Sequence, residues 1–393
     1  MPDFAVLKDE IQDFINQNLQ ADLPALILKG SPFKEVSIQE IAAQIEAKQK
    51  AKKKLPTWFN AKNILYPPTL NLEQTSSEVT ARHKAILVNG KVIDLTGGFG
   101  IDSHFFCKKA EEVWHCEINT ELSLLATHNH KILAPKCKMN FVTGNGLEFL
   151  KNESLEFDWV YIDPSRREKG KKVFLLENST PNILENLEWI SKKTQKLLIK
   201  TSPLLDINRS IQQLKWVNKL HIVAIDNEVK ELLWVVEPNY QTEKIKVECF
   251  NYKSKSTEKF TCLFSSIKEK EISYSKPQQF LYEPNAAIMK SACFQALAEK
   301  YSVKKIAANT HLFTADQQID FPGRRFKILE KLHFSKKALA NSGIKKANIA
   351  TRNFVLSVEQ IRKKFKIKDG GETYLFFVTT QDEEKMILVC EKI

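Results

Sequence analysis

The chain has 393 residues, of which 43% are hydrophobic and 27% charged, so it has ample material for a core and exceeds an ordinary single domain. No apolar run is long enough to span a membrane. The first residues, MPDFAVLKDEIQDF, are acidic and amphipathic where a signal peptide would be basic and then apolar, which predicts a cytoplasmic protein.

The formal net charge of +12 is concentrated in one part of the chain. Residues 321–368 hold fourteen Lys and Arg against two acids, which equals the excess of the whole chain. A shorter basic run, KQKAKKK, covers residues 48–54. This distribution predicts a surface for a polyanion, with nucleic acid first and an anionic membrane second. A solvated helix face that aids solubility is the alternative interpretation.

The cysteines and histidines predict no metal site. The seven cysteines are scattered and form no CxxC pair, which is typical of a reducing compartment and of cysteines used as small core residues. His128 and His130 lie two residues apart, a spacing that does not place both on one helix face.

The N-terminal region is predicted to be helical. From Phe4 to Lys54 apolar residues recur at three- and four-residue steps, and Ser37 with Glu40 three residues on predicts a capping box. Residues 55–78 are irregular and proline-rich, so we expect a linker or a strap over the next domain.

Seven β-rich runs follow at 91–96, 112–118, 139–144, 157–163, 196–202, 219–226 and 231–237. Stretches long enough for a helix separate the first five, which predicts a doubly wound, mainly parallel α/β sheet. Only NEVK separates the last two, which favours a closing hairpin. Another seven-stranded α/β arrangement is the alternative.

After Pro238 the pattern predicts two small α+β modules, at about 240–320 and 321–393. The first would contain a β-hairpin (IKVECFNY and KFTCLFSS) and one helix over residues 284–301. The second would contain a strand at 321–335, a basic helix at 357–367, and closing strands at 373–380 and 385–393.

The stretch DLTGGFG ends the first predicted strand, where ligands bind in open α/β sheets. Gly98 and Gly100 let the backbone approach a ligand. A dinucleotide loop would carry a third glycine where Ser103 stands, and the Asp102 carboxylate would repel a phosphate. Asp94 can instead pair with a cationic amino group. These residues favour S-adenosylmethionine over a dinucleotide.

The spacing Asp94-x-Thr96-x-Gly98-x-Gly100 resembles the first motif of class I methyltransferases, with Thr96 in place of a glycine. The resemblance implies that Glu117 holds the ribose hydroxyls, that Asn145 faces the adenine amine, and that DPSR follows the fourth strand as the catalytic motif. The cofactor residues it implies in this region are Asp94, Thr96, Gly97, Gly98, Gly100, Asp102, Glu117, Ile118, Asn145 and Gly146.

The DPSR motif departs from the Asp/Asn-Pro-Pro-aromatic pattern of methyltransferases that act on exocyclic amines. Asp163 can still orient a nucleophilic nitrogen and help to remove its proton. Base stacking would have to come from elsewhere or from the flat guanidinium of Arg166. The catalytic residues predicted here are Asp163, Pro164, Ser165 and Arg166. A mobile charged connection is the alternative for the basic residues that follow.

The lead-in LEQTSSEVTARHKA (residues 72–85) resembles a segment that some RNA methyltransferases, including the trimethylguanosine synthase group, fold over the methionine end of the cofactor. This assigns Thr75 and Ser76 to the cofactor. A capped helix that packs on the sheet is the alternative.

The whole chain resembles a bacterial group of methyltransferases inferred to act on RNA, through LEQTSSE, DLTGGFGID, DPSRR, LYEPNAAIMKSACFQALAEKY, NTHLFT, FPGRRF and RNFVLSVEQIRKKFKIKDGGETYLF. The resemblance implies a helical region (1–70), a seven-stranded Rossmann-like methyltransferase domain (71–238), a β-hairpin with a ferredoxin-like module (239–320) and a basic THUMP-like domain (321–393). It also implies contacts to RNA through Arg324, Arg325, Lys345, Lys346, Arg352, Arg362, Lys363 and Lys364.

We therefore expect an S-adenosylmethionine-dependent methyltransferase that acts on a base, guanine by preference, in structured RNA such as tRNA or rRNA. Two alternatives stay open: a methyltransferase of a protein or small molecule, and a non-catalytic RNA-binding factor that retains the cofactor fold. We expect no metal and no membrane partner, and the sequence leaves the oligomeric state open.

Overall fold

The computed structural model describes residues 4–165, 167–168, 171–172, 176–240, 244–264 and 272–393. The chain divides into two units. Unit 1 comprises residues 1–216 and 234–240, and unit 2 comprises residues 217–233 and 241–393. The boundaries expected near residues 70, 238 and 320 remain predictions.

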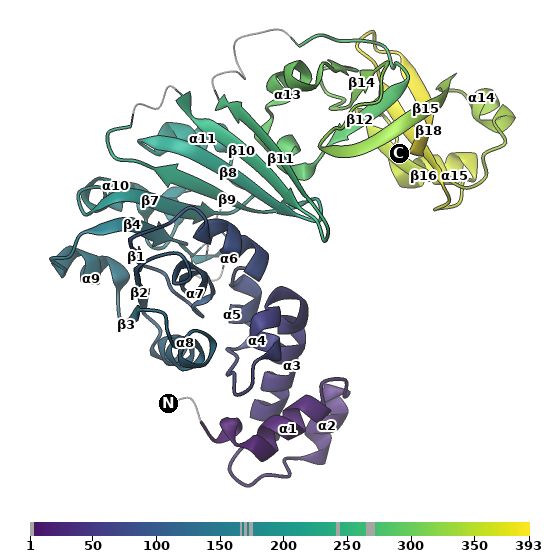
Figure 1. Cartoon of the computed structure of the whole chain (residues 1–393). Coiled ribbons are helices and arrows are strands. Elements are labelled where there is room, and N and C mark those ends of the chain that lie inside the picture. The colour runs from purple at the N-terminus through teal and green to yellow at the C-terminus, as the bar shows by residue number, and fades with distance from the viewer. Residues whose placement is uncertain (1–3, 166, 169–170, 173–175, 241–243, 265–271) are drawn as a thin grey trace. The chain divides into compact units, whose positions relative to one another are not determined.

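Unit 1 begins with a helical region (Figure 1). The predicted capping box is confirmed: the Ser37 backbone N–H donates to Glu40 at 2.9 Å, and the Glu40 N–H donates to the Ser37 hydroxyl at 3.2 Å. The elements are η1 (Phe4–Leu7), α1 (Asp9–Gln17), α2 (Leu23–Lys29), α3 (Ile38–Lys54), α4 (Pro56–Asn60), α5 (Thr69–Gln74) and α6 (Glu78–Ala85).

The segment expected to be irregular, residues 55–78, is partly helical because it contains α4 and α5. It does act as a strap over the following domain. The Leu65 backbone donates to and accepts from the side chain of Asn129, at 3.0 and 2.8 Å. Trp58 in α4 is 2% exposed, so the strap also contributes to the core.

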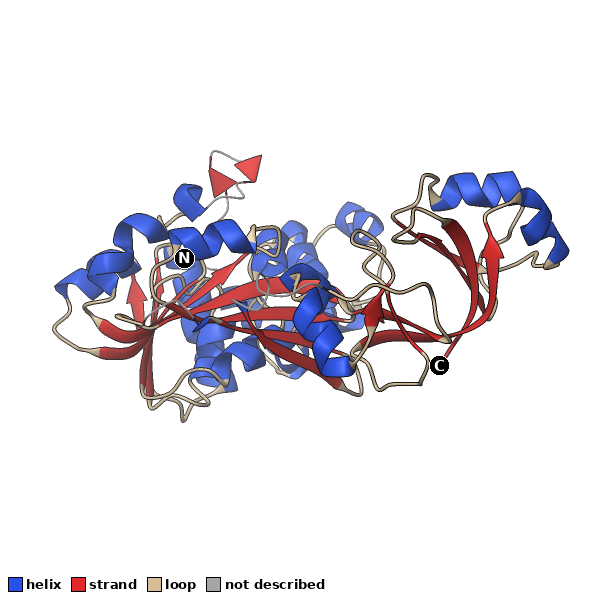
Figure 2. Cartoon of the chain, turned by 90° about the horizontal axis from the view of Figure 1, so that it is seen from above, coloured by secondary structure: helices blue, strands red, loops and turns tan. Residues whose placement is uncertain are grey.

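A nine-stranded sheet has the order β11-β10-β8-β9-β7-β4-β1-β2-β3. Neighbours among β7, β4, β1, β2 and β3 are parallel, as predicted for a doubly wound fold. Figure 2 shows helices on both faces of the sheet. The strands are β1 (Lys91–Asp94), β2 (Glu112–Glu117), β3 (Met139–Thr143), β4 (Phe157–Ile162), β7 (Thr194–Thr201), β8 (Val217–Ile225), β9 (Glu228–Val236), β10 (Lys246–Tyr252) and β11 (Thr257–Leu263).

The connections of unit 1 include five helices and a small two-stranded sheet. The helices are α7 (Ile101–Phe106), α8 (Thr120–Leu133), α9 (Gly146–Asn152), α10 (Ile183–Ile190) and α11 (Ile207–Gln213), with a short η2 (Leu176–Asn178). The strands β5 (Arg167–Glu168) and β6 (Lys171–Lys172) pair antiparallel in a two-stranded sheet.

The predicted hairpin after the fifth parallel strand is present. Asp226 and Asn227 alone connect β8 to β9, and both have positive φ, 48° and 65°, as a type I′ turn requires. The later hairpin, β10–β11, was expected in a separate module. It instead extends the large sheet, because β10 pairs parallel with β8 from Lys246 to Tyr252. The sequence shows that two strands form a hairpin, but it does not show which edge they join.

Unit 2 also contains a seven-stranded sheet of order β13-β14-β12-β15-β18-β17-β16. The strands are β12 (Phe280–Pro284), β13 (Lys304–Lys305), β14 (Phe313–Ala315), β15 (Gly323–His333), β16 (Asn348–Arg352), β17 (Thr373–Thr379) and β18 (Lys385–Lys392). β15 pairs with β12 on one side and with β18 on the other. One sheet therefore runs through both of the small modules expected from the sequence.

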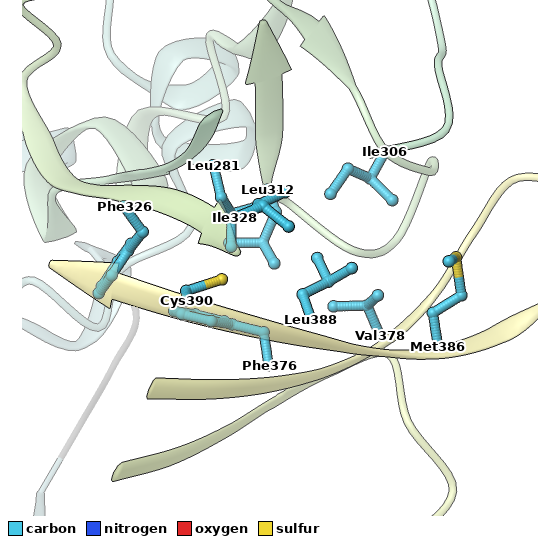
Figure 3. Packing of buried hydrophobic residues seen from close by; sticks show 10 residues of the cluster. All are labelled: Leu281, Ile306, Leu312, Phe326, Ile328, Phe376, Val378, Met386, Leu388 and Cys390. Atoms are coloured by element: carbon cyan, nitrogen blue, oxygen red, sulfur yellow. The ribbon is translucent and has the colours of Figure 1, made fainter. Parts of the chain in front are cut away.

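The two faces of this sheet bury different apolar clusters. Figure 3 shows the first, in which Leu281 and Leu312 pack with Phe326, Phe376 and residues of β18. The opposite cluster lies with the helices α14 (Lys336–Asn341) and α15 (Val358–Phe365) and contains Leu339, Ile361, Ile367, Leu375, Phe377, Ile387 and Val389. Consecutive residues of β17 alternate between the clusters, as side chains of a strand must.

The prediction of one continuous helix over residues 284–301 is wrong in one respect, because this segment is divided. It forms two helices, α12 (Ala286–Ser291) and α13 (Phe294–Tyr301), because Ala292 adopts a left-handed conformation with φ of 55°. The helix α14 and the strand β16 were not predicted.

Candidate active site

The predicted ligand-binding residues of unit 1 gather at the carboxyl ends of β3, β2, β1, β4 and β7. These strands are parallel neighbours, so their carboxyl ends share one edge of the sheet. We call this the ligand edge. Glu117, Asp163 and Lys200 each stand at a strand end on it, and the glycine loop (residues 94–100) follows β1.

The three glycines of the loop have different tasks. A Cβ on Gly97 would lie 2.2 Å from the buried ring of His115, so there is room only for a glycine at this position. Gly100 begins α7 in a left-handed conformation, with φ of 81°. Gly98 also has positive φ, 55°, but a Cβ there would meet no atom closer than the Thr96 carbonyl at 3.9 Å. Gly98 is therefore the position where the bare backbone faces open space.

The Glu117 carboxylate is attached to the same loop. Its Oε2 accepts a hydrogen bond from the Gly98 N–H at 2.7 Å, and its Oε1 accepts one from the Asn119 N–H at 2.7 Å. Each oxygen keeps further acceptor capacity, which suits a vicinal diol such as that of ribose. Ile118, the next residue, is 73% exposed and offers an apolar surface beside that carboxylate.

Asp94 lies beneath the loop. It is 1% exposed, and it accepts hydrogen bonds from the Thr96 N–H at 3.0 Å and the Ser103 hydroxyl at 2.6 Å. Burial raises the pKa of Asp94 to about 7. The hydrogen bonds from Ser103 and Thr96 lower this pKa, whereas the nearby carboxylates of Asp102 and Asp163 raise it further. The structure thus shows Asp94 holding the loop, and its pairing with a ligand amine stays a prediction.

Asp102 and Ser76, both assigned to the cofactor, bond to each other. The Ser76 hydroxyl donates to Asp102 at 2.8 Å, Tyr161 donates to the same oxygen at 2.8 Å, and the fully buried ammonium of Lys84 lies 3.2 Å from the other oxygen. Burial opposes ionisation of Asp102, but the charges of Lys84 and Lys200, together with the hydrogen bonds from Tyr161 and Ser76, outweigh it and lower its pKa. This buried network joins the lead-in helix α6 to the start of α7.

Thr75 has a local bond in this structure, because its hydroxyl donates to the Leu72 carbonyl at 2.9 Å at the end of α5. The next helix, α6, is capped by Ser77, whose hydroxyl accepts from the Thr80 N–H at 3.2 Å, as the alternative interpretation of the lead-in expected. Contact of Thr75 and Ser76 with a cofactor remains a prediction.

Asp163 connects the catalytic motif to the glycine loop. Its backbone N–H donates to the Thr96 hydroxyl at 2.7 Å, and its Oδ2 forms an ion pair with Lys200 at the end of β7. The Asp163 side chain is 30% exposed and that of Lys200 10%. The pair therefore lies at the base of the ligand edge with its carboxylate partly open to solvent.

The rest of the DPSR motif is described only in part. Pro164 is buried, and Ser165 is exposed while its backbone pairs with Thr180, with N···O distances of 2.7 and 3.1 Å. Arg166 lies outside the described residues. Stacking of its guanidinium on a base stays a prediction.

After β3, Asn145 caps α9. Its side-chain carbonyl accepts from the Leu147 and Glu148 N–H groups at 3.0 and 3.5 Å. Only a glycine fits at position 146, since a Cβ there would lie 2.6 Å from the Leu95 carbonyl oxygen. The predicted bond from the adenine amine to Asn145 would have to share the capping carbonyl, and it remains a prediction.

Sequence reasoning missed Lys84, Lys200 and the buried pair Ser103–His115. The signal for Lys200 was available, because a lysine inside the apolar run KLLIKTS calls for a charged partner when it is buried. Ser103 bonds to His115 Nδ1 at 3.0 Å, and burial lowers the pKa of His115 to about 3, so this ring is neutral. His115 therefore serves as packing beneath Gly97 and brings no charge to the site.

The residues assigned to RNA form two groups in unit 2. The arginines are in ion pairs: Arg324 and Arg352 with Glu283, Arg325 with Asp320, and Arg362 with Asp369. Exposed lysines form what we call the lysine surface, on α14, on α15 and on the segments beside them. They are Lys336, Lys337, Lys345, Lys346, Lys363, Lys364, Lys366 and Lys368. Backbone bonds from Lys368 to Lys345 and from Ala347 to Lys368 bring these segments together.

Within the described part of the chain, no group of three or more His, Cys, Asp or Glu side chains could hold a metal ion. None of the helices in those same ranges is both long enough and apolar enough to cross a membrane.

A doubly wound sheet with a glycine loop after β1, an acid at the end of β2 and another after β4 is compatible with a class I methyltransferase, although dinucleotide-binding folds share the loop and the first acid. Two C-terminal segments match known domain families: residues 280–322 match a ferredoxin-like domain, and residues 323–392 match a family described as THUMP domain-like. Together with the full-length structural match described next, these segments confirm the resemblance that the sequence indicated, a methyltransferase fold followed by ferredoxin-like and THUMP-like segments.

A solved structure of a candidate methyltransferase from Porphyromonas gingivalis W83 is similar over the full length. It has 29% sequence identity and a TM-score of 0.90, and the match covers 100% of this chain and 99% of that chain. The search of curated proteins finds no match.

Two further solved structures are partial matches. M. capricolum TrmK with S-adenosylhomocysteine shows 17% identity and a TM-score of 0.32 over 41% of this chain and 68% of that chain. A candidate RNA methyltransferase from Pyrococcus horikoshii shows 16% identity and a TM-score of 0.34 over 48% and 98%.

Proposed function

We propose that this protein transfers a methyl group from S-adenosylmethionine to a base of structured RNA, tRNA or rRNA, with guanine as the preferred base. The observation that carries the proposal is the ligand edge of unit 1. There Gly98 leaves open space beside its backbone, and the Glu117 carboxylate, with further acceptor capacity, is bonded to the Gly98 N–H.

The charges at the ligand edge fit a cationic cofactor. Asp94, Asp102, Glu117 and Asp163 supply four carboxylates, and Lys84 and Lys200 supply two ammonium groups, which leaves two negative charges when all are ionised. S-adenosylmethionine carries a sulfonium, an ammonium and a carboxylate, so its net charge is positive. A dinucleotide would bring two phosphates to an edge that already carries excess negative charge.

Methyl transfer requires little acid–base catalysis by the protein. S-adenosylmethionine supplies a methyl group already activated by the positive sulfur. Glu117 and Ile118 would hold the ribose and cover the adenine. Asp163 would position the acceptor nitrogen and take its proton, because its backbone is bonded to Thr96 of the loop and its side chain is partly exposed.

The lysine surface supports RNA as the acceptor. Its ammonium groups are exposed, and among the described residues none of them forms an ion pair, so they can neutralise phosphates at low desolvation cost. The THUMP domain-like match over residues 323–392 covers this surface.

The test uses full-length protein, methyl-labelled S-adenosylmethionine and total RNA from a strain that lacks the gene. We expect acid-precipitable label that RNase removes, and about 100-fold less label with Asp163→Ala. Lys52→Ala, in the exposed basic run of α3, is the matched control and should keep full activity.

Other outcomes identify the alternatives. Label that survives RNase in a cell extract would indicate a protein or small-molecule acceptor. Calorimetric binding of the cofactor without any labelled product would indicate a non-catalytic RNA-binding factor. An absence of cofactor binding would contradict the proposal as a whole.

A further inference from the structure

The proposed function leaves the acceptor atom open, and the pair of Asp163 and Lys200 bears on it. We infer that the acceptor is a ring nitrogen that carries a hydrogen next to a carbonyl group, N1 of guanine, rather than an exocyclic amine. This inference rests on the proposed function and adds Lys200 to its catalytic residues.

The geometry places a proton acceptor and a cation side by side at the ligand edge, where the proposed function puts the acceptor base. Asp163 and Lys200 end the neighbouring strands β4 and β7. Lys200 bonds to Oδ2 of Asp163, so Oδ1 is the oxygen placed to accept from a base. The backbone of Asp163 is bonded to Thr96 at 2.7 Å, which fixes this pair against the loop that faces the cofactor.

The chemistry of the two kinds of acceptor separates them. An exocyclic amine attacks as a neutral group and gains positive charge, so a buried ammonium beside it would raise the barrier. Guanine N1 attacks after loss of its proton, and negative charge then develops on O6. An ammonium that donates a hydrogen bond to O6 stabilises that charge where water is largely excluded. The 10% exposure of the Lys200 side chain meets this condition.

The proposed step balances. The N1 proton passes to Oδ1 of Asp163, and the N1 lone pair forms the bond to the methyl carbon. The bond between that carbon and sulfur breaks, and its electron pair stays on sulfur. The products are N1-methylguanine and S-adenosylhomocysteine, and Asp163 later releases its proton to water.

The first test identifies the product. Total RNA from a strain that lacks the gene is methylated by the full-length protein, digested to nucleosides and analysed by mass spectrometry. We expect 1-methylguanosine. N2-methylguanosine, N6-methyladenosine or any other methylated nucleoside would overturn this inference but leave the proposed function standing. If no nucleoside gains a methyl group, the proposed function itself fails.

The second test measures the pH profile of Lys200→Met. At pH 7 we expect kcat to fall about 100-fold, the cost of removing one donor to a developing oxyanion. The loss should shrink as the pH rises, because hydroxide can then remove the N1 proton. Lys200→Arg should recover most of the activity, since it keeps a cation that donates hydrogen bonds.

Lys196→Met is the matched control, because Lys196 lies on the same strand, is 41% exposed and pairs with Glu237 at 3.2 Å. It should keep the wild-type kcat. Cofactor binding by calorimetry shows whether each variant folds. A Lys200→Met protein that binds the cofactor and has unchanged kcat, or a loss that is the same at every pH, would overturn the inference.

Discussion

The charges at the ligand edge of unit 1 and those of the lysine surface of unit 2 are used in opposite ways. At the ligand edge, Lys84 and Lys200 are buried and each contacts a carboxylate. On the lysine surface the ammonium groups are exposed. A buried pair fixes geometry, because each partner is costly to leave alone, whereas an exposed charge acts at a distance and is screened by salt.

The arginines of unit 2 show that a basic residue in the segment assigned to RNA can serve in a fixed ion pair instead of an exposed, available charge. Arg324 and Arg352 share the carboxylate of Glu283, whose side chain is 9% exposed, so they resemble the charges of the ligand edge more than their lysine neighbours. Positive charge counted along the sequence therefore overestimates the charge that is available to a polyanion.

The largest expected effect is that of Lys84→Met. Removing the fully buried ammonium leaves the buried Asp102 carboxylate without its ion-pair partner, which should lower the free energy of unfolding by about 3–5 kcal/mol. Denaturant unfolding measures this change. Arg325→Met breaks a pair whose carboxylate is 99% exposed and should cost less than about 1 kcal/mol. Equal losses in the two variants would contradict the distinction between buried and exposed charges.

The next effect concerns pH. The folded-state pKa of Asp94 is raised to about 7 from 3.8, so the folded state binds this proton more tightly than the unfolded state. Its contribution to stability is complete below pH 3.8 and is lost as the pH rises through 7. Asp94→Asn cannot titrate. The wild type should therefore lose up to about 4 kcal/mol relative to this variant between pH 4 and pH 8.

Thermal unfolding of both proteins across that range checks the prediction. The Asn side chain can still accept from the Thr96 N–H, and Ser103 can donate to His115 instead, so the variant should fold. Parallel pH profiles for the two proteins would show that Asp94 does not titrate in this window.

The sequence predicts well what depends on local pattern. The capping box of Ser37, the five parallel strands and the acid at the end of β2 all follow from periodicity and spacing. It predicts poorly what depends on tertiary partners. Ser76 and Asp102 lie 26 residues apart and were both assigned to a ligand, yet they bond to each other.

Two other failures have the same cause. A lysine in an apolar run indicates that it needs a charged partner, but a strand pattern does not show which side chain it meets, so the pairing of Lys200 with Asp163 was not predicted. The break at Ala292 is likewise invisible in a segment of good helix formers, because a left-handed alanine is tolerated only where the surrounding structure favours it.

A moderate effect is expected from Glu117→Ala. The carboxylate organises the Gly98 and Asn119 N–H groups and, in our proposal, holds the ribose diol. Its loss should weaken cofactor binding about 10- to 100-fold, as for a charged hydrogen bond, and should change RNA binding little. Calorimetry and a filter-binding assay measure the two affinities. Weaker RNA binding in this variant would mean that the ligand edge also carries RNA affinity.

The smallest effect is expected from the lysine surface. Lys345→Ala with Lys363→Ala removes two exposed charges and should reduce the slope of log K against log salt by about 2, one for each phosphate contact, with bulk tRNA from the deletion strain as the probe. Lys52→Ala with Lys53→Ala removes the same charge from α3 and should leave the slope unchanged. If both double variants reduce the slope equally, RNA binding depends on the net charge of the protein and not on the lysine surface. The buried charges of the ligand edge and the exposed lysines would then differ in their effect on stability but not in their effect on RNA binding.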